Sequence, residues 1–279
     1  MDYPLALIGY PIQHSLSPWI HRTFLEETDL KGNYTIEEIF PARFESEIQY
    51  LLDKGYVGFN VTLPFKQKII PLLDELDDNA KQIGAVNTVV KRNNRLIGYN
   101  TDGIGYIRTL EQYYPEFMKN KEKHILIIGA GGAARGIYFA LNQFGFQSID
   151  ITNRTTENAL EIVKGKAAKT YSEVISLSKA QENLKKYDLI IQTTSVGMKP
   201  NTEQSPLQLH NLKDSVIVSD ILYQPIWTNF IKDAVAQGAR IHLGHTMLLN
   251  QAQYAFEIWT GKQPSIKGMD QKLKQILEG

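Results

Sequence analysis

The chain has 279 residues, and its 30 Lys and Arg side chains balance its 30 Asp and Glu side chains, which argues against a nucleic acid or an anionic membrane as partner. The absence of cysteine excludes disulfides and thiolate metal sites, and no apolar run approaches membrane-spanning length. The start of the chain lacks the basic and apolar regions of a signal peptide, so we expect a cytoplasmic protein.

Residues 1–100 alternate predicted strands and helices. The apolar patterns predict strands at 5–9, 33–40 and 58–62 and helices at 18–27 and 42–54. A further helical stretch is expected to begin at Pro64 and to be split at Pro71, because an internal proline interrupts the hydrogen-bond ladder. Strands at 86–91 and 96–100, joined by Asn93-Asn94, predict a hairpin, so this sheet should be mixed.

Polar residues gather at the predicted ends of these elements, where open α/β sheets bind ligands. Ser17 before Pro18 is typical of a helix N-cap, but two hydroxyls at a helix start, with Ser15 as the second, also suit a carboxylate. Lys66 is expected in the first turn of a helix, where a cation opposes the helix dipole at a cost of up to about 1 kcal/mol. This cost favours a functional role, with a tolerated surface lysine as the alternative.

Asp102 and Gln251 also have two interpretations each. Asp102 precedes a glycine, so it is either a turn residue or a catalytic group. Gln251 lies on the apolar side of its predicted helix and needs a hydrogen-bond partner. This partner is either another group of the protein, in a structural role, or a ligand. His14, His21 and His245 have no metal-ligand spacing with carboxylates, so we predict no metal site.

The stretch from Lys123 to Arg154 predicts a nucleotide site. A buried strand at 124–128 leads into Gly129-Ala-Gly-Gly-Ala-Ala134, a Gly-x-Gly-x-x-Ala turn, and a helix is predicted at 133–144. Small residues let the backbone approach a pyrophosphate, and the helix N-terminus offers free N–H groups. The alternative is an α/β turn that binds nothing.

The residues after the next predicted strand, at 148–152, indicate which cofactor this site takes. NAD sites usually place an acidic residue here, where it binds the ribose hydroxyls. This chain has Asn153-Arg154-Thr155 instead. Because a guanidinium pairs with a phosphate, the sequence predicts NADP as the cofactor.

The rest of the chain continues the alternation. Strands are predicted at 188–194, 215–222 and 240–244, charged helical segments at 157–165 and 173–186, and C-terminal helices at 246–260 and 270–277. The whole pattern predicts an α/β fold, with parallel strands covered by helices on both faces.

Motifs over nearly the whole chain resemble the shikimate dehydrogenase family. They are His14-Ser-Leu-Ser-Pro18, Asn60-Val-Thr-Leu-Pro-Phe-Lys66, Gly84-Ala-Val-Asn-Thr88, Asn100-Thr-Asp-Gly103, Gly129-Ala-Gly-Gly-Ala133, Asn153-Arg-Thr155, Thr194-Ser-Val-Gly-Met198, Asp220-Ile-Leu-Tyr-Gln-Pro225, Met247-Leu-Leu-Asn-Gln-Ala252 and Trp259-Thr-Gly261. The resemblance implies a mixed-sheet substrate-binding domain at 1–103 and a Rossmann-type NADP domain at 104–243. It also implies that C-terminal helices at 244–279 pack back on the substrate domain.

The resemblance further implies a cytoplasmic oxidoreductase of the shikimate pathway, in chorismate and aromatic amino-acid biosynthesis, that reduces 3-dehydroshikimate to shikimate with NADPH. Its partners would be small molecules only, and it would be a monomer or a homodimer. Lys66 and Asp102 match the catalytic pair, which also contacts the substrate. Residues that match holders of the substrate carboxylate are Ser15, Ser17 and Tyr223, and those that match contacts of the ring hydroxyls are Asn60, Thr62, Asn87 and Gln251. Residues that match cofactor contacts are Gly129, Ala130, Gly131, Gly132, Ala133, Asn153, Arg154, Thr155, Thr194, Gly244 and Met247.

Three positions depart from the family pattern. Asn158 stands where a second basic residue is common, Gly244-His-Thr246 precedes Met247 where small or aliphatic residues are commoner, and Gln192 replaces a frequent asparagine. Two other functions stay open: a quinate/shikimate dehydrogenase with broader substrate or cofactor use, and a non-catalytic relative that senses a metabolite. The retained Lys66 and Asp102 argue against the second.

Overall fold

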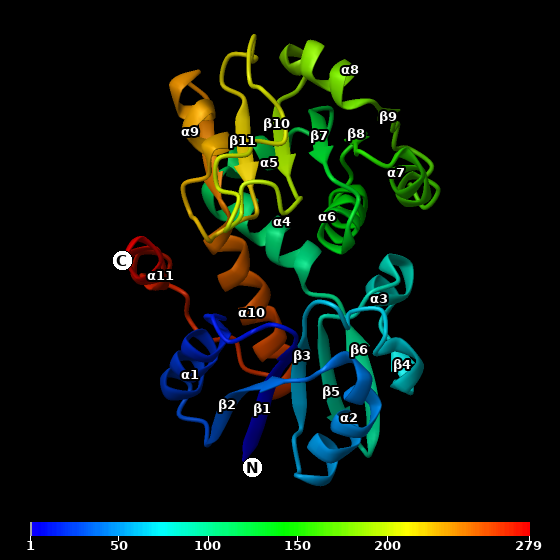
Figure 1. The fold of residues 1–279 in the computed structure, drawn as a ribbon, viewed down its shortest axis with the longest axis vertical. Helices are drawn as coiled ribbons and strands as arrows, with labels where there is room; N and C mark the ends of the chain where they lie inside the picture. Colours follow the sequence, from blue (N-terminus) through cyan, green and yellow to red (C-terminus); the bar gives the residue numbers. More distant parts are fainter. Residues whose placement is uncertain (1) are drawn as a thin grey trace. The chain divides into compact units, whose positions relative to one another are not determined.

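The computed structural model describes residues 2–279, which divide into two compact units. One unit comprises the residues up to Gly105 together with Leu249–Lys267, and the other comprises Tyr106–Leu248 together with Gly268–Gly279. Each unit has its own six-stranded sheet, so the predicted α/β fold is confirmed (Figure 1). Within residues 2–279, no helix is both long and apolar enough to cross a membrane.

The sheet of the first unit is mixed, as predicted. Its strands, in spatial order, are β2 (Gly32–Glu38), β1 (Tyr3–Gly9), β3 (Gly58–Val61), β5 (Thr88–Arg92), β6 (Arg95–Tyr99) and β4 (Glu75–Leu76). β1 runs parallel to β2 and β3, whereas β5 pairs antiparallel with β3 and β6. The β5–β6 hairpin turns through Asn93 and Asn94, whose φ angles of 49° and 61° suit a two-residue turn of type I′.

Apolar layers cover both faces of this sheet. Successive residues of a strand point to opposite faces, so Leu5 of β1 packs in the cluster of Trp259, while Ala6 packs in the opposite cluster with Ile48. The helical elements of this unit are α1 (Ser17–Glu27), η1 (Pro41–Arg43), α2 (Phe44–Asp53), η2 (Ile70–Leu72), α3 (Asp78–Ile83) and most of α10 (Gly244–Thr260). Because both faces of the sheet are covered, a ligand can approach it at the ends of its strands.

The prediction that a helical stretch begins at Pro64 is wrong. Residues 63–69 form turns, and only the short η2 follows. The carbonyl oxygen of Lys66 accepts a hydrogen bond from the Val86 N–H at 2.8 Å, so a contact distant in sequence takes the place of a helical one. Lys66 therefore does not oppose a helix dipole, and its role must be argued from its side chain.

The helix α3 was not predicted, although both of its ends carry known signals. The Asp77 carboxylate accepts the Ala80 N–H at 2.9 Å, and Gly84 ends the helix with a φ of 67°. With only six residues, α3 is too short for apolar periodicity to reveal it.

The sheet of the second unit is parallel throughout. Its strands, in spatial order, are β12 (Arg240–Leu243), β11 (Ile217–Asp220), β10 (Leu189–Gln192), β7 (His124–Ile128), β8 (Ser148–Thr152) and β9 (Val174–Ile175). The chain builds outward from β7 through β8 and β9, then returns to β10 and builds the other way. Sheets of this order bind dinucleotides where the direction reverses, which here is between β7 and β10.

The helices of the second unit differ more from expectation than its strands do. They are most of α4 (Asp102–Tyr113), α5 (Pro115–Lys119), α6 (Gly132–Gln143), α7 (Thr156–Val163), α8 (Leu177–Glu182), η3 (Leu184–Lys186), α9 (Asn229–Ala236) and α11 (Met269–Glu278). α5 and α9 were not predicted, and the segment predicted as helical at 173–186 is divided among β9, α8 and η3.

The last helix, α11, belongs to the second unit rather than to the first. The Tyr113 hydroxyl donates to Asp270 at 2.7 Å, and Trp227 Nε1 donates to Glu278 Oε1 at 2.9 Å. This differs from the expectation that both C-terminal helices pack on the first domain. The reason is that these two hydrogen bonds attach α11 to α4 and to the loop after β11.

His242 is a buried titratable group at the end of β12. Its Nδ1 lies 2.8 Å from Ser219 Oγ, and its Nε2 lies 3.0 Å from Thr246 Oγ1. The pKa of His242 is lowered to about 3, chiefly by burial and to a smaller extent by the nearby His245. The folded protein therefore keeps this imidazole neutral at pH values where the unfolded chain protonates it.

We predict that His242→Gln makes the free energy of unfolding less dependent on pH between about 6.5 and 5. In the wild type, the unfolded state binds a proton below pH 6.5 that the folded state does not bind, so stability is lost as the pH falls. The slope owed to His242 approaches roughly 1.4 kcal/mol per pH unit.

Urea denaturation of both proteins across this pH range measures the two slopes. Groups that titrate in both proteins contribute equally to the two slopes, so their contributions cancel in the difference. One such group is Asp220, whose pKa is raised to about 7 by burial. Equal slopes would mean that His242 is protonated in the folded state.

Candidate functional site

An ion pair between Lys66 and Asp102 forms the centre of the candidate site in the first unit. Lys66 Nζ donates to Asp102 Oδ2 at 2.7 Å, and the two side chains are only 22% and 11% exposed. Asp102 is the first residue of α4, where a carboxylate interacts favourably with the helix dipole, so it is not a turn residue. The partial burial of Lys66 against one carboxylate favours a functional role over that of a tolerated surface lysine.

Asn87 holds the other oxygen of Asp102. Asn87 Nδ2 donates to Asp102 Oδ1 at 2.8 Å and to Thr101 Oγ1 at 3.0 Å. The backbone sets the orientation of this amide, because the Thr101 N–H, which can only donate, meets Asn87 Oδ1 at 2.9 Å. Both oxygens of Asp102 therefore have a fixed donor, one an ammonium and the other an amide.

Asn60 extends this network to β3. Its Nδ2 donates to the Asn87 carbonyl at 3.1 Å and to Thr88 Oγ1 at 3.0 Å, and its Oδ1 accepts the Tyr34 hydroxyl at 2.7 Å. Thr88 Oγ1 in turn donates to Asn87 Oδ1 at 3.0 Å. Both amide hydrogens of Asn60 are engaged, so a substrate hydroxyl can interact with this residue only by donating to Oδ1.

Gln251 of α10 joins the same network through Thr101. The Thr101 hydroxyl donates to Gln251 Oε1 at 3.2 Å. The two helices approach closely here because Gly105 has no side chain, and a Cβ at that position would lie 2.7 Å from the Gln251 N atom. The polar group on the apolar side of α10 is thus brought beside Asp102.

Ser15 and Ser17 lie at the start of α1, but the N-cap role predicted for Ser17 is wrong. Leu16 occupies the cap position, and its own side chain makes no capping hydrogen bond. Instead, Ser15 Oγ accepts the Ser17 N–H and donates to Ser17 Oγ, both at 3.2 Å. Burial raises the pKa of Tyr34, and a hydrogen bond with Ser17 opposes this rise. The hydroxyls of the two serines lie together at the start of α1.

Sequence reasoning missed Tyr34, Thr88 and Thr101. Thr88 and Thr101 lie in the motifs next to Asn87 and Asp102, so their neighbours were a usable signal. Tyr34 carried none, because an aromatic residue within a strand is more often part of the core.

Thr62, the remaining predicted contact of the first unit, directly follows β3. Its N–H donates to the Ile8 carbonyl at 2.9 Å, and a Cβ at Gly9 would lie 2.4 Å from its methyl carbon. The close approach of Gly9 in β1 therefore holds Thr62 in place beside the turns that carry Lys66.

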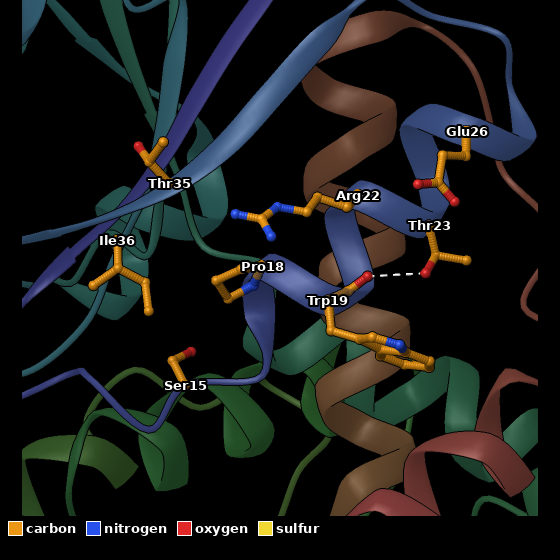
Figure 2. Close-up of a pocket in the computed structure, with 8 residues that line it drawn as sticks. All are labelled: Ser15, Pro18, Trp19, Arg22, Thr23, Glu26, Thr35 and Ile36. Carbon is orange, nitrogen blue, oxygen red and sulfur yellow. Dashed lines mark hydrogen bonds between the residues drawn. The ribbon is translucent and has the colours of Figure 1, made fainter.

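A cavity of about 770 Å³ borders the start of α1. The residues that line it are Ser15, Pro18, Trp19, Arg22, Thr23, Glu26, Thr35 and Ile36. Figure 2 shows Arg22 reaching from α1 toward the strand that carries Thr35 and Ile36, and its Nη2 donates to the Tyr34 carbonyl at 3.4 Å. Of the predicted substrate contacts only Ser15 lines this cavity, and neither Lys66 nor Asp102 does.

In the second unit, the predicted glycine turn lies where the strand order reverses. Gly129 follows β7 with a φ of 115°, and a Cβ there would lie 2.5 Å from Thr193 Oγ1, so this position requires glycine. An added Cβ at Gly131 or Gly132 would meet nothing within 4 Å, and no side chain caps the start of α6. Uncapped N–H groups beside open space are what a pyrophosphate needs. The predicted turn residues are thus together, namely Gly129, Ala130, Gly131, Gly132 and Ala133.

The residues expected to select the cofactor follow β8. Asn153 Nδ2 donates to the Thr155 carbonyl at 2.7 Å, which shapes the turn into α7. Arg154 lies in this turn and is exposed, as is Asn158 in the first turn of α7. A guanidinium in this setting can pair with a phosphate without losing a buried partner.

Four further predicted residues lie in loops and helix starts of the second unit. Tyr223 is half-buried in the loop after β11, and Met247 is buried in the first turns of α10. Gly244 begins α10 so close to the loop after β11 that a Cβ would lie 2.3 Å from a carbonyl oxygen of that loop. The N–H and hydroxyl of Thr194 both donate to Gln192 Oε1, at 2.9 Å and 3.0 Å.

His245, which departs from the family pattern, lies close to α11. Burial lowers the pKa of His245 to about 4, Asp270 and Glu278 act to raise it, and Lys274 acts to lower it. All three charged residues belong to α11, so the electrostatic environment of this imidazole is set by that helix.

Three family models match successive parts of the chain. The shikimate dehydrogenase substrate binding domain matches residues 7–89, and the shikimate/quinate 5-dehydrogenase model matches residues 113–221. The shikimate 5′-dehydrogenase C-terminal domain matches residues 244–274.

Individual relatives match over the full length. The chain is 49% identical over 280 residues to the shikimate dehydrogenase (NADP(+)) of Oceanobacillus iheyensis, covering 100% of both chains. A shikimate 5-dehydrogenase from Thermus thermophilus, solved in complex with NADP(H) and shikimate, matches with a TM-score of 0.86 at 32% identity, covering 98% of this chain and 99% of that one. A quinate dehydrogenase from Corynebacterium glutamicum, solved in complex with NAD, matches with a TM-score of 0.88 at 27% identity, covering 99% of this chain and 100% of that one.

We predict that Gly132→Ala weakens NADP binding without lowering stability. The added methyl group enters open space, so the free energy of unfolding should stay within about 0.5 kcal/mol of the wild type. It would obstruct the close approach of a phosphate to the first N–H groups of α6, and the loss of one charge-assisted hydrogen bond weakens binding roughly tenfold or more.

Calorimetric titration and thermal melting measure the two quantities. Gly129→Ala is the matched control, because its strained φ and its contact with Thr193 should lower stability by about 1–3 kcal/mol. Unchanged NADP affinity in Gly132→Ala would show that no phosphate binds at this turn.

Proposed function

The chain belongs to the shikimate dehydrogenase family, and we propose that it catalyses the reversible, NADP-dependent reduction of 3-dehydroshikimate to shikimate. The observation that carries the proposal is the 2.7 Å ion pair of Lys66 and Asp102, which Asn87 fixes from the other side. The second unit supports it with a glycine turn that has room for a pyrophosphate. Acid–base chemistry and a dinucleotide site are what this reaction requires.

NADP fits the residues of the second unit. The proposed pyrophosphate contacts are the N–H groups of the turn, and Arg154 is the proposed contact of the 2′-phosphate. The residues proposed to hold the cofactor are Gly129, Ala130, Gly131, Gly132, Ala133, Asn153, Arg154, Thr155, Gly244 and Met247. When bound, NADPH supplies a hydride to the ring ketone.

Lys66 is the proposed proton donor. As the carbonyl carbon is reduced, negative charge develops on its oxygen, and a positioned acid or cation lowers the energy of that charge. Lys66 donates a proton from Nζ to this oxygen, which completes the alcohol, and its partial exposure lets it regain a proton from water. Asp102 holds Nζ in place throughout. In the oxidation direction, Lys66 takes the hydroxyl proton.

Polar side chains predicted from the sequence are proposed to hold the substrate. Ser15 and Ser17 present two hydroxyls 3.2 Å apart at the start of α1, a spacing that suits the two oxygens of one carboxylate. Tyr223 is the proposed third contact of that carboxylate. The ring hydroxyls are proposed to meet Asn60, Thr62, Asn87 and Gln251. Asn60 contributes as an acceptor, because its amide hydrogens are already engaged.

Quinate oxidation is the second candidate activity. It is favoured by the family model for shikimate/quinate 5-dehydrogenase and by the likeness to a quinate dehydrogenase. Arg154, however, favours NADP over the NAD that is bound in that neighbour. A metabolite sensor without catalysis is disfavoured, because the Lys66–Asp102 pair is intact.

One assay separates these functions. The purified chain is mixed with shikimate or quinate, each with NADP or NAD, and the absorbance of the reduced nicotinamide is followed. We expect the highest kcat/KM for shikimate with NADP. Comparable values for quinate would establish the broader enzyme, and binding of shikimate without turnover in any combination would establish a sensor.

Arg154 should determine the cofactor preference. We predict that Arg154→Ala lowers kcat/KM for NADP about ten- to a hundredfold and leaves that for NAD unchanged, because one charge-assisted contact is lost. Asn158 provides no second cation, so the loss should be toward the lower end. Lys164→Ala, at an exposed lysine that directly follows α7, is the control and should change neither value. A wild type with equal efficiency for both cofactors, unaltered by Arg154→Ala, would contradict this role.

Lys66→Ala is predicted to lower kcat by about 10²–10⁴-fold while NADP binding and the melting temperature are kept, because a general acid contributes on that scale. Asp102→Asn should lose a comparable factor, since an amide cannot pair with the Lys66 ammonium as a carboxylate does. Lys68→Ala, an exposed lysine of the same turns, is the matched control.

Steady-state kinetics at saturating shikimate measure these losses. If Lys66→Ala retains near-normal kcat and only raises KM, Lys66 is a binding residue and the proposed mechanism is wrong.

A further inference from the structure

Gln192 closes a ring of hydrogen bonds with the loop that follows β10. Gln192 Oε1 accepts the Thr194 N–H at 2.9 Å and the Thr194 hydroxyl at 3.0 Å, and Nε2 donates to the Val196 carbonyl at 2.9 Å. The Val196 N–H donates back to Thr194 Oγ1 at 3.1 Å. A backbone N–H can only donate and a carbonyl can only accept, so the orientation of the Gln192 amide is fixed.

The loop held in this way lies against the glycine turn. Gln192 pairs with Ile128 across β10 and β7, the two strands between which the sheet reverses, and the Thr193 hydroxyl donates to the Ile128 carbonyl at 2.7 Å. A Cβ at Gly129 would lie 2.5 Å from Thr193 Oγ1 and 2.9 Å from the Thr194 methyl carbon. The side chains of these two threonines therefore pack directly against Gly129.

Gln192 cannot contact a bound ligand, because its side chain is fully buried. The N–H and hydroxyl of Thr194 are likewise engaged, since both donate to Gln192 and the hydroxyl oxygen accepts from the Val196 N–H. What Thr194 presents to Gly129 is its methyl group. Any effect of Gln192 on the cofactor must therefore act through the shape of the turn.

We propose that Gln192 is a positioning residue of the cofactor site, which locks the loop of Thr193–Val196 beneath Gly129 and so preorganises the turn for the pyrophosphate. The inference rests on the proposed use of NADP. A loop that is already ordered in the free protein does not have to lose conformational freedom on binding, and this strengthens affinity. Thr194, predicted to contact the cofactor, then acts as a support of the turn.

Gln192→Met tests this role, because it keeps the length of the side chain and removes both polar atoms. We expect the Kd of NADP, measured by calorimetry, to rise about tenfold. The Kd of adenosine 2′-phosphate, which has no pyrophosphate and reaches only the Arg154 end of the site, should not change. Thr194→Val keeps the methyl group and removes the hydroxyl bonds, so it should follow Gln192→Met.

Ser219→Ala is the control for a purely structural effect. It removes a buried hydroxyl that contacts His242 from the neighbouring strand β11, so it should lower the melting temperature without changing the Kd of NADP. Wild-type NADP affinity in both Gln192→Met and Thr194→Val, or equal weakening of NADP and adenosine 2′-phosphate, would overturn the positioning role. Absence of NADP binding by the wild type would instead contradict the proposed function.

Discussion

The candidate site depends on how the carboxylate of Asp102 is held. A partly buried ion pair loses hydration, and it is stable only if the remaining polar atoms also find partners. Here Lys66 takes one oxygen and an amide takes the other, and the donors point in one direction along Tyr34, Asn60, Thr88, Asn87 and Asp102. The β-sheet provides this line of polar residues, because β3 and β5 are neighbours and α4 begins directly after β6. Lys66 is thereby held by the sheet, although it lies in a segment without regular structure.

The candidate nucleotide site of the second unit depends on open space beside the backbone rather than on polar side chains. Gly131 and Gly132 leave the start of α6 open, Gly129 permits the close approach of the loop after β10, and the parallel sheet brings these segments together where its strand order reverses. Such a site is sensitive to added volume, whereas the Lys66–Asp102 site is sensitive to lost polar atoms. The nucleotide site is therefore tested by substitutions that add volume, and the Lys66–Asp102 site by substitutions that remove polar atoms.

Local patterns predicted the strands of both units better than the short helices that connect them. β7 and β8 have the predicted bounds, because each is a short apolar run between clear turn signals. The helix expected at Pro64 is absent, since the Lys66 carbonyl bonds to Val86, and no local pattern reveals a partner so distant in sequence. Lys66 and Asp102 lie 36 residues apart, so their pairing followed from the family resemblance and not from spacing. The role of Tyr34 in the site was not predicted, because a buried aromatic residue in a strand is expected in any hydrophobic core.

The most direct test of the central claim is the turnover of the Lys66→Ala/Asp102→Asn double variant relative to each single variant. Residues that act as one unit are not additive, because losing either member already removes the function of both. The double variant should therefore have a kcat close to that of the slower single variant, with NADP binding retained. A kcat reduced by the product of the two single losses would show that Lys66 and Asp102 act independently, and it would contradict the account of a proton donor held in place by its carboxylate.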